Sequence, residues 1–473
     1  MSLEAVATTL DAYALALCPF SFELLHSHVA SLSKVLGFAP DQLRYTLSLF
    51  AAYPLALVFR ALPPAGKHWF SFITGVLMAQ FVLGSQWIHS FLAATTTYAL
   101  VKFAPPTAAP ALVFVFNMAY LSASHLYRIY VDYLGWSLDF TGPQMLLVIK
   151  LTSFAYNVYD GAVTDTKQSD RVLKVREALA VKALPSLVEF YGFAFCFATF
   201  LAGPAFEYRS YADAISGATL KLAHKASALT SCFAAGASKL LIGVACMAAI
   251  AKFGATFTLG GAFDDASSSL AYRVFAIYVA LLLTRCKYYA AWKVAEGATV
   301  LCGFGCEGID ANGRVLGWNA VSNVDILGFE GGQSIRDLSR AWNKGTQSWL
   351  ERYVYSRSGN SLAATYFVSA FWHGFYPGYY LFFLTVPLPT AVNRVARAKL
   401  RPYFVGNAVA KAVYDVLGWL ATTVVINYLA VAFVSLSWSA SISRWSQVFF
   451  AGHVGLLVAY GLLSLLPKPV KQI

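Results

Sequence analysis

The sequence predicts an all-α, polytopic membrane protein, and three observations favour this fold class. Of the 473 residues, 58% are hydrophobic and only 12% are charged, whereas soluble domains are about 45–50% apolar and about 25% charged. Apolar stretches close to the roughly 20 residues that cross a bilayer recur along the chain. In lipid, open strands leave backbone polar groups unpaired, so we expect these stretches to be helices. Residues 1–473 are predicted to form a single membrane-embedded domain.

About eleven hydrophobic helical segments are expected, some of them re-entrant. They are 46–61, 69–84, 87–103, 108–127, 143–160, 185–202, 227–253, 271–300, 361–390, 412–436 and 446–466. Lys and Arg mark cytosolic loops, and they assign both flanks of 185–202 and of 361–390 to the cytosolic side. These two segments are therefore expected to enter and leave on one side. Gly374 and Pro377 supply a helix break inside the second segment.

The formal net charge of +12 indicates basic surfaces and anionic partners. In a membrane protein such an excess marks cytosolic loops, and it attracts the phosphates of anionic cofactors or lipid head groups. Nucleic acid is disfavoured as a partner because no separate basic domain carries the charge. Cys302 and Cys306 form a C-x3-C pair without a second ligand pair nearby, so no metal site is predicted.

His373 is the first candidate for chemistry, because it lies among apolar and aromatic residues beside the expected break at Gly374. An ionisable group inside a membrane costs roughly 2.5–3.5 kcal/mol on insertion scales, so it is usually functional or paired. The alternative is a structural histidine that is bonded to a backbone carbonyl.

Asn343 is the second candidate, on a stretch predicted to form an interfacial helix over 335–353. The apolar residues of that stretch recur at helical spacing with charges opposite. Asn343 borders the apolar stripe, where an asparagine commonly serves as a solvated or capping residue. Gly345 weakens the continuity of such a helix by about 1 kcal/mol.

A third set of polar residues follows one face of a helix near 285–296. Arg285, Tyr289 and Glu296 are spaced for that face. Eleven residues rise about 16 Å, so Arg285 and Glu296 need separate partners. Ion pairing between helices and a polar-lined substrate cavity are both open interpretations.

Several motifs together resemble the membrane-bound O-acyltransferase family, in particular its lysophospholipid acyltransferase branch and the plant-type members of that branch. The two most specific are Trp342-Asn343-x-x-Thr346-x-x-Trp349-Leu350 and Trp372-His373-Gly374-x-x-Pro377-Gly378-Tyr379. Further matching blocks are Pro185-Ser186-Leu187-x-Glu189-Phe190-x-Gly192, Ala202-Gly203-Pro204-x-Phe206-Glu207, Lys287-Tyr288-Tyr289-x-x-Trp292-x-x-x-Glu296 and Asn323-Val324-Asp325. The block Asn157-Val158-Tyr159-Asp160-Gly161 matches the branch's N-Y-N-D-G only at its first and last two positions.

The resemblance implies a single acyltransferase domain of helices around a substrate tunnel, with His373 and Asn343 as the catalytic pair. Neutral imidazole, with an ordinary pKa of about 6.5, suits a general base that takes the proton of an attacking alcohol. A carboxamide can donate to the developing oxyanion. The substrate-binding residues are predicted to be Trp342, Arg285, Tyr289, Glu296 and Trp372.

The implied reaction is acylation of lysophospholipids bearing choline, ethanolamine or serine, in phospholipid remodelling. Acyl-CoA is the expected co-substrate, so no permanently bound cofactor is predicted, and membrane lipids are the other expected partners. Residence in the endoplasmic reticulum rests on the resemblance alone. The alternatives are a sterol or diacylglycerol as acceptor, a membrane transporter, and a covalent mechanism through Cys286.

Overall fold

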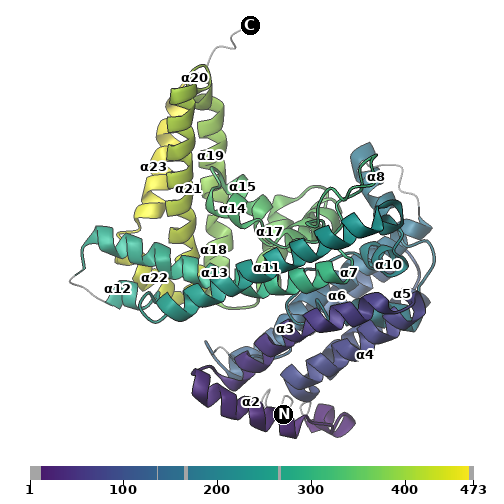
Figure 1. Ribbon diagram of the computed structural model, residues 1–473. Coiled ribbons are helices and arrows are strands. Elements are labelled where there is room, and N and C mark those ends of the chain that lie inside the picture. The colour runs from purple at the N-terminus through teal and green to yellow at the C-terminus, as the bar shows by residue number, and fades with distance from the viewer. Residues whose placement is uncertain (1–11, 136, 164–168, 265–267, 468–473) are drawn as a thin grey trace. The chain divides into compact units, whose positions relative to one another are not determined.

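The computed structural model describes residues 12–135, 137–163, 169–264 and 268–467. Within these residues every regular element is a helix, as the composition predicted, and only an isolated bridge joins Ile309 to Val315. Residues 164–168 of the predicted basic loop lie outside the described residues. The chain divides into two compact units, and Figure 1 labels helices of both.

Unit 1 consists of Met1–Val244, Ala290–Asn323 and Ser348–Ser361. Its complete helices are α2 (Glu23–Leu36), α3 (Pro40–Ala61), α4 (Pro64–Leu83), η1 (Gly84–Gln86), α5 (Trp87–Phe103), α6 (Ala109–Val131), α7 (Thr141–Ala162), α8 (Asp170–Leu179), α9 (Leu187–Ala194), α10 (Tyr208–Ser216), η2 (Thr219–Leu222) and the π-helix η3 (Leu350–Tyr355). Helix α4 packs on α9 and α3, and α5, α6 and α7 pack on one another. Aromatic residues from these helices dominate the core.

Unit 2 consists of Ala245–Tyr289, Val324–Gln347 and Leu362–Ile473. Its complete helices are α12 (Gly261–Asp264), α14 (Ile326–Glu330), α15 (Ile335–Ala341), α17 (Leu362–His373), α18 (Pro377–Thr385), α19 (Pro387–Lys399), α20 (Arg401–Phe404), α21 (Ala408–Ser435), α22 (Trp438–Ser446) and α23 (Ala451–Leu465). Three helices are shared, because the boundaries between the units fall within α11 (Lys225–Phe253), α13 (Leu270–Leu301) and α16 (Lys344–Trp349).

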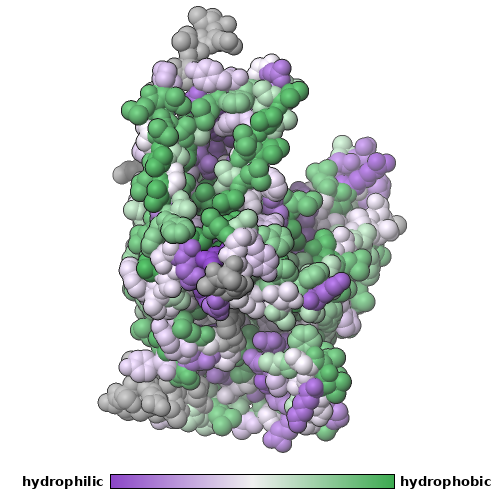
Figure 2. All heavy atoms as spheres, turned by 90° about the vertical axis from the view of Figure 1, so that its left-hand side faces the viewer, coloured by the Kyte–Doolittle hydropathy of each residue, from purple (hydrophilic) through white to green (hydrophobic). Residues whose placement is uncertain are grey.

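The described helices include five that are long and apolar enough to cross a membrane. A bent pair, α22 and α23, makes a sixth if it counts as one span. Many large apolar side chains of α21 and α23 are exposed, and Figure 2 shows hydrophobic residues over much of the face that these helices form. A soluble monomer rarely exposes so much contiguous apolar surface, so this face is suited to lipid.

The two segments expected to be re-entrant contain only short helices. Helix α9 has 8 residues and ends at Ala194. The segment 361–390 contains α17 of 12 residues, α18 of 9 and the first residues of α19. The break falls at Gly374, whose φ of +113° suits glycine. The predicted break is therefore confirmed, and the side on which each segment enters stays a prediction.

The prediction of one continuous interfacial helix over 335–353 is wrong. Helix α15 ends at Ala341, α16 begins at Lys344, and a π-helix follows from Leu350. The break lies at Asn343, whose φ is +44°, rather than at Gly345. Asparagine adopts this left-handed conformation more readily than most residues, because its short polar side chain bonds locally.

A close approach of α4 and α9 gives a prediction about stability. The Ser71 hydroxyl donates to the Gly192 carbonyl at 2.8 Å, and a Cβ on Gly75, one turn later, would overlap the Phe195 carbonyl. Because backbone cannot rotate away, Gly75→Ala should destabilise the protein by about 1–3 kcal/mol or more. Thermal unfolding in detergent measures this, with Gly142→Ala as the control, because a Cβ there meets nothing within 4 Å. Equal melting temperatures for the two variants would contradict the packing described.

Candidate active site

His373 occupies the last position of α17, directly before the break. Its Nδ1 lies 2.7 Å from the backbone carbonyl oxygen of Ser369, one turn earlier. A carbonyl oxygen only accepts, so Nδ1 carries the proton, and the lone pair of the neutral ring lies on Nε2. This is the bond expected of a structural histidine. It is also the bond that orients a histidine base, since it fixes both the tautomer and the plane of the ring.

Aromatic rings surround the imidazole of His373 within unit 2. Its ring centroid lies 4.7 Å from that of Trp372, 5.7 Å from Tyr379, 4.9 Å from Phe383 and 5.4 Å from Phe433. Trp372 is 6% exposed, and its indole, predicted to bind substrate, packs against the imidazole of His373. These rings hold the imidazole in an environment of low polarity, in which electrostatic interactions are stronger than in water.

Asn343 directly precedes α16 and is partly buried. Its carbonyl oxygen accepts the first helical hydrogen bond, from Gln347 N at 2.9 Å. Asn343 therefore caps α16 through its backbone carbonyl, in line with the capping role that the sequence left open. Positive φ at this position turns the chain sharply between α15 and α16, and places the carboxamide at the turn. The donor role of the carboxamide stays a prediction.

Asn343 and His373 belong to the same compact unit, although 30 positions separate them in the sequence. Each is held by a short-range backbone bond, and each lies at a break between helices. The approach of the carboxamide to the imidazole stays a prediction.

The predicted residues Arg285, Tyr289 and Trp342 are brought together around Glu330 in unit 2. Arg285 donates from Nε and Nη2 to the two carboxylate oxygens of Glu330, at 2.7 and 2.9 Å. The Tyr289 hydroxyl donates to the same carboxylate at 2.7 Å. The ring of Tyr289 then meets the Trp342 indole with centroids 5.8 Å apart.

Glu296, the remaining predicted residue, lies in unit 1 and is 0% exposed. Its Oε2 accepts from Lys293 at 2.8 Å and from Lys239 at 3.2 Å, and its Oε1 accepts from the backbone N–H of Asn323 at 2.6 Å. Ion pairing, one of the two interpretations left open for this helix face, is thus what the structure shows for both Arg285 and Glu296. The substrate-binding role of Glu296 stays a prediction.

A second polar cluster in unit 1 joins two of the sequence blocks noted above to the π-helix η3. Asn157 donates to Glu207 at 2.8 Å and accepts from the Tyr353 hydroxyl at 2.8 Å, and Arg352 donates to the other oxygen of Glu207 at 3.0 Å. Burial raises the pKa of Tyr353, which keeps its phenol protonated as a donor. The partly matching Asn157 block therefore has a structural role in fastening the π-helix η3.

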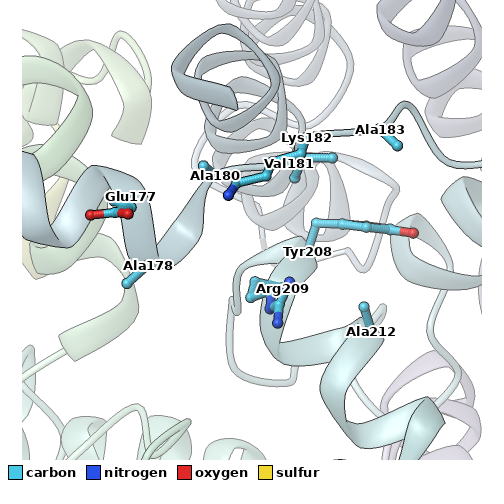
Figure 3. Close-up of a pocket in the computed structure, with 9 residues that line it drawn as sticks. All are labelled: Glu177, Ala178, Ala180, Val181, Lys182, Ala183, Tyr208, Arg209 and Ala212. Carbon is cyan, nitrogen blue, oxygen red and sulfur yellow. The ribbon is translucent and has the colours of Figure 1, made fainter. Parts of the chain in front are cut away.

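A surface pocket of 560 Å³ opens in unit 1 (Figure 3). It is lined by residues 177, 178, 180–183, 208, 209 and 212, including the cations Lys182 and Arg209. Arg209 is already paired with Asp213 at 3.2 Å. All lining residues belong to unit 1, whereas Asn343 and His373 belong to unit 2. Among the described residues, no group of three His, Cys, Asp or Glu side chains is placed to hold a metal ion.

Glu330 is the residue of this site that sequence reasoning missed. Its position seven residues after Asn323 gives no periodic signal, and its partner Arg285 lies 45 positions earlier. The clue in the sequence was the charge of Arg285 within an apolar helix. This charge requires an acidic partner, but the sequence does not identify which residue that is.

Comparison with known proteins identifies the relatives of this chain. A model of the membrane-bound O-acyltransferase family matches residues 125–431. Membrane-bound glycerophospholipid O-acyltransferase 2 of Gallus gallus is 32% identical over 462 residues, covering 93% of this chain and 88% of the relative. Lysophospholipid acyltransferase of Schizosaccharomyces pombe is 30% identical over 471 residues, covering 93% and 89%. Membrane-bound glycerophospholipid O-acyltransferase 1 of Homo sapiens is 29% identical over 467 residues, covering 94% of each chain. With its blocks in the predicted order and this extent of similarity, the chain belongs to the membrane-bound O-acyltransferase family and is an acyltransferase.

Proposed function

We propose that this protein transfers an acyl group from acyl-CoA to lysophospholipids, giving diacyl phospholipids in membrane remodelling. The relatives named above carry glycerophospholipid or lysophospholipid in their names. The observation that carries the proposal in the structure is the bond of His373 Nδ1 to the Ser369 carbonyl, which leaves Nε2 as the basic nitrogen. Family membership removes the transporter alternative.

In the proposed reaction, His373 Nε2 takes the proton of the lysolipid hydroxyl as its oxygen attacks the thioester carbon. The Asn343 carboxamide donates a hydrogen bond to the carbonyl oxygen, where negative charge develops. The C–S bond then breaks, and CoA leaves as a thiolate that receives the proton from the imidazolium. An ester bond replaces the thioester, so no metal ion or permanently bound cofactor takes part in the scheme.

The finer features of the fold belong to the same proposal. A tunnel would admit acyl-CoA from the basic cytosolic side and the lysolipid from the bilayer. Re-entry of 361–390 would place the break at Gly374, and His373 beside it, inside the membrane. Irregular backbone at that depth is tolerated only where it is buried in protein or lines a cavity, which fits a substrate path. We also propose residence in the endoplasmic reticulum.

The product formed by the wild-type protein tests the substrate class. Purified protein with labelled oleoyl-CoA is offered lysophosphatidylcholine, lysophosphatidylethanolamine, lysophosphatidylserine, a sterol and diacylglycerol together. We expect diacyl phospholipids as the labelled products in mass spectrometry. Label found solely in sterol ester or triacylglycerol would contradict the proposal and show that the acceptor is a sterol or diacylglycerol.

His373→Ala should lower kcat by about 100- to 10,000-fold, because the proton acceptor is lost. The matched control is His28→Ala: His28 is exposed on α2 and makes the same type of bond, from Nδ1 to the Leu24 carbonyl at 2.6 Å. Initial rates and thermal stability are measured for both variants. Cys286→Ala should keep its turnover if transfer is direct, whereas loss of turnover in that variant would favour the covalent mechanism.

Asn343→Gly should lower kcat by about 100- to 1,000-fold, the effect of one oxyanion donor. Glycine is chosen because it accepts a φ of +44° and so removes the carboxamide without straining the backbone. Asn360→Gly is the control, since Asn360 is exposed and also left-handed, at φ +63°. The comparison is made on kcat at saturating substrates. Wild-type turnover in Asn343→Gly would show that the carboxamide is dispensable.

A further inference from the structure

Glu330 is the hub of a polar network that lies entirely in unit 2. It receives two hydrogen bonds from Arg285 and one from Tyr289 through its carboxylate. Its backbone carbonyl accepts from Trp419 Nε1 of α21 at 2.7 Å. The remaining Arg285 nitrogen, Nη1, donates to Asn427 Oδ1 at 2.8 Å. The network therefore ties α13 and α14 to α21 with charge-assisted bonds, which are the stronger kind.

The same network closes around the indole of Trp342. Three rings enclose it: Tyr289 at 5.8 Å, Tyr288 at 5.7 Å and Phe329 at 5.0 Å between centroids. Tyr289 is held by its hydroxyl on Glu330, and Phe329 directly precedes Glu330 in α14. The guanidinium of Arg285 also lies 5.6 Å from the Phe329 ring. The position of the indole thus depends on the carboxylate of Glu330.

The residue after Trp342 is Asn343, in its left-handed turn. A backbone in this region is costlier than helix or strand for any residue except glycine, and persists when its surroundings hold it. An indole enclosed by three rings fixes the chain just before the turn. The first hydrogen bond of α16, from Gln347 N to Asn343 O, fixes it just after.

We propose that Glu330 is a positioning residue, which holds Tyr289 and Phe329 against Trp342 and thereby fixes the turn that presents the Asn343 carboxamide. The inference rests on the role of Asn343 in the proposed function and deepens it. It also assigns Arg285 and Tyr289 to this clamp rather than to a substrate. Arg285 is 9% exposed, Tyr289 is 1% exposed, and the charge of the guanidinium is met by Glu330.

The kinetic test separates positioning from substrate binding. Tyr289→Phe keeps the ring against Trp342 and removes its tether to Glu330, and should lower kcat about 3- to 10-fold. Glu330→Gln removes the charge and should lower kcat about 10- to 100-fold. KM for oleoyl-CoA and for the lysolipid should stay within about twofold in both variants, because a positioning residue acts on the transition state. Glu330→Asp, which restores the charge, should recover part of the loss.

Matched controls come from exposed positions of the same residue types. Tyr460→Phe and Glu351→Gln alter side chains outside the network, and both should retain wild-type kinetics. A raised KM with unchanged kcat in Tyr289→Phe would overturn the proposal in favour of substrate binding. Unchanged kcat and KM would overturn it as well. If Glu330→Gln fails to fold, Tyr289→Phe and Glu330→Asp carry the test.

Hydrogen exchange supplies a readout that does not need activity. Amide exchange in peptides covering 335–347 should be faster in Tyr289→Phe than in the wild type or in Tyr460→Phe, since the turn is less firmly held. Unchanged exchange there would overturn the clamp. A wild-type protein that forms no diacyl phospholipid, yet shows the faster exchange in Tyr289→Phe, would refute the proposed function while leaving the clamp standing.

Discussion

Every charge that this chain buries has to find a partner within the protein, and that constraint organises both units. Moving an ion from water into an apolar interior costs several kcal/mol even after relaxation, and only close partners offset it. Glu296 therefore binds two lysines in unit 1, and Arg285 is paired with Glu330 in unit 2. Lys293 lies on the same helix as Glu296, whereas Lys239 and Glu330 come from distant parts of the sequence, so the pairs that they form fix one helix against another.

Lys150 shows how the same constraint is met without a carboxylate partner. It is 1% exposed, and its ammonium donates to the carbonyls of Phe193 and Ala194 at the end of α9. The last carbonyls of a helix lack partners within it and carry partial negative charge. The Phe193 and Phe206 rings lie over the ammonium, at 4.5 and 4.8 Å. Lys150 therefore caps the C-terminal end of α9, a helix of 8 residues that is too short to span a membrane.

Sequence reasoning succeeded where the determining interactions are local. The face bearing Arg285 and Tyr289 follows from helical spacing, and the end of α17 follows from a glycine beside His373. It failed at Asn343, because the left-handed turn depends on rings supplied by α13 and α14, which no local pattern reveals. Glu330 was missed for the same reason: the charge of Arg285 demands a partner, but only the fold brings together residues 45 positions apart.

The two helix breaks, at Asn343 and after His373, have the same physical explanation. A continuous helix satisfies its own backbone, and so offers few polar groups to a reaction inside a membrane. At Asn343 and at His373 the helix stops, and in each case one bond to a backbone carbonyl fixes the geometry: Gln347 N to Asn343 O, and His373 Nδ1 to Ser369 O. An interrupted backbone costs stability, which the network on Glu330 offsets at the first break and the aromatic rings around the imidazole offset at the second. The proposed acyl transfer between a thioester and an alcohol would require a carboxamide and a basic nitrogen in fixed orientations.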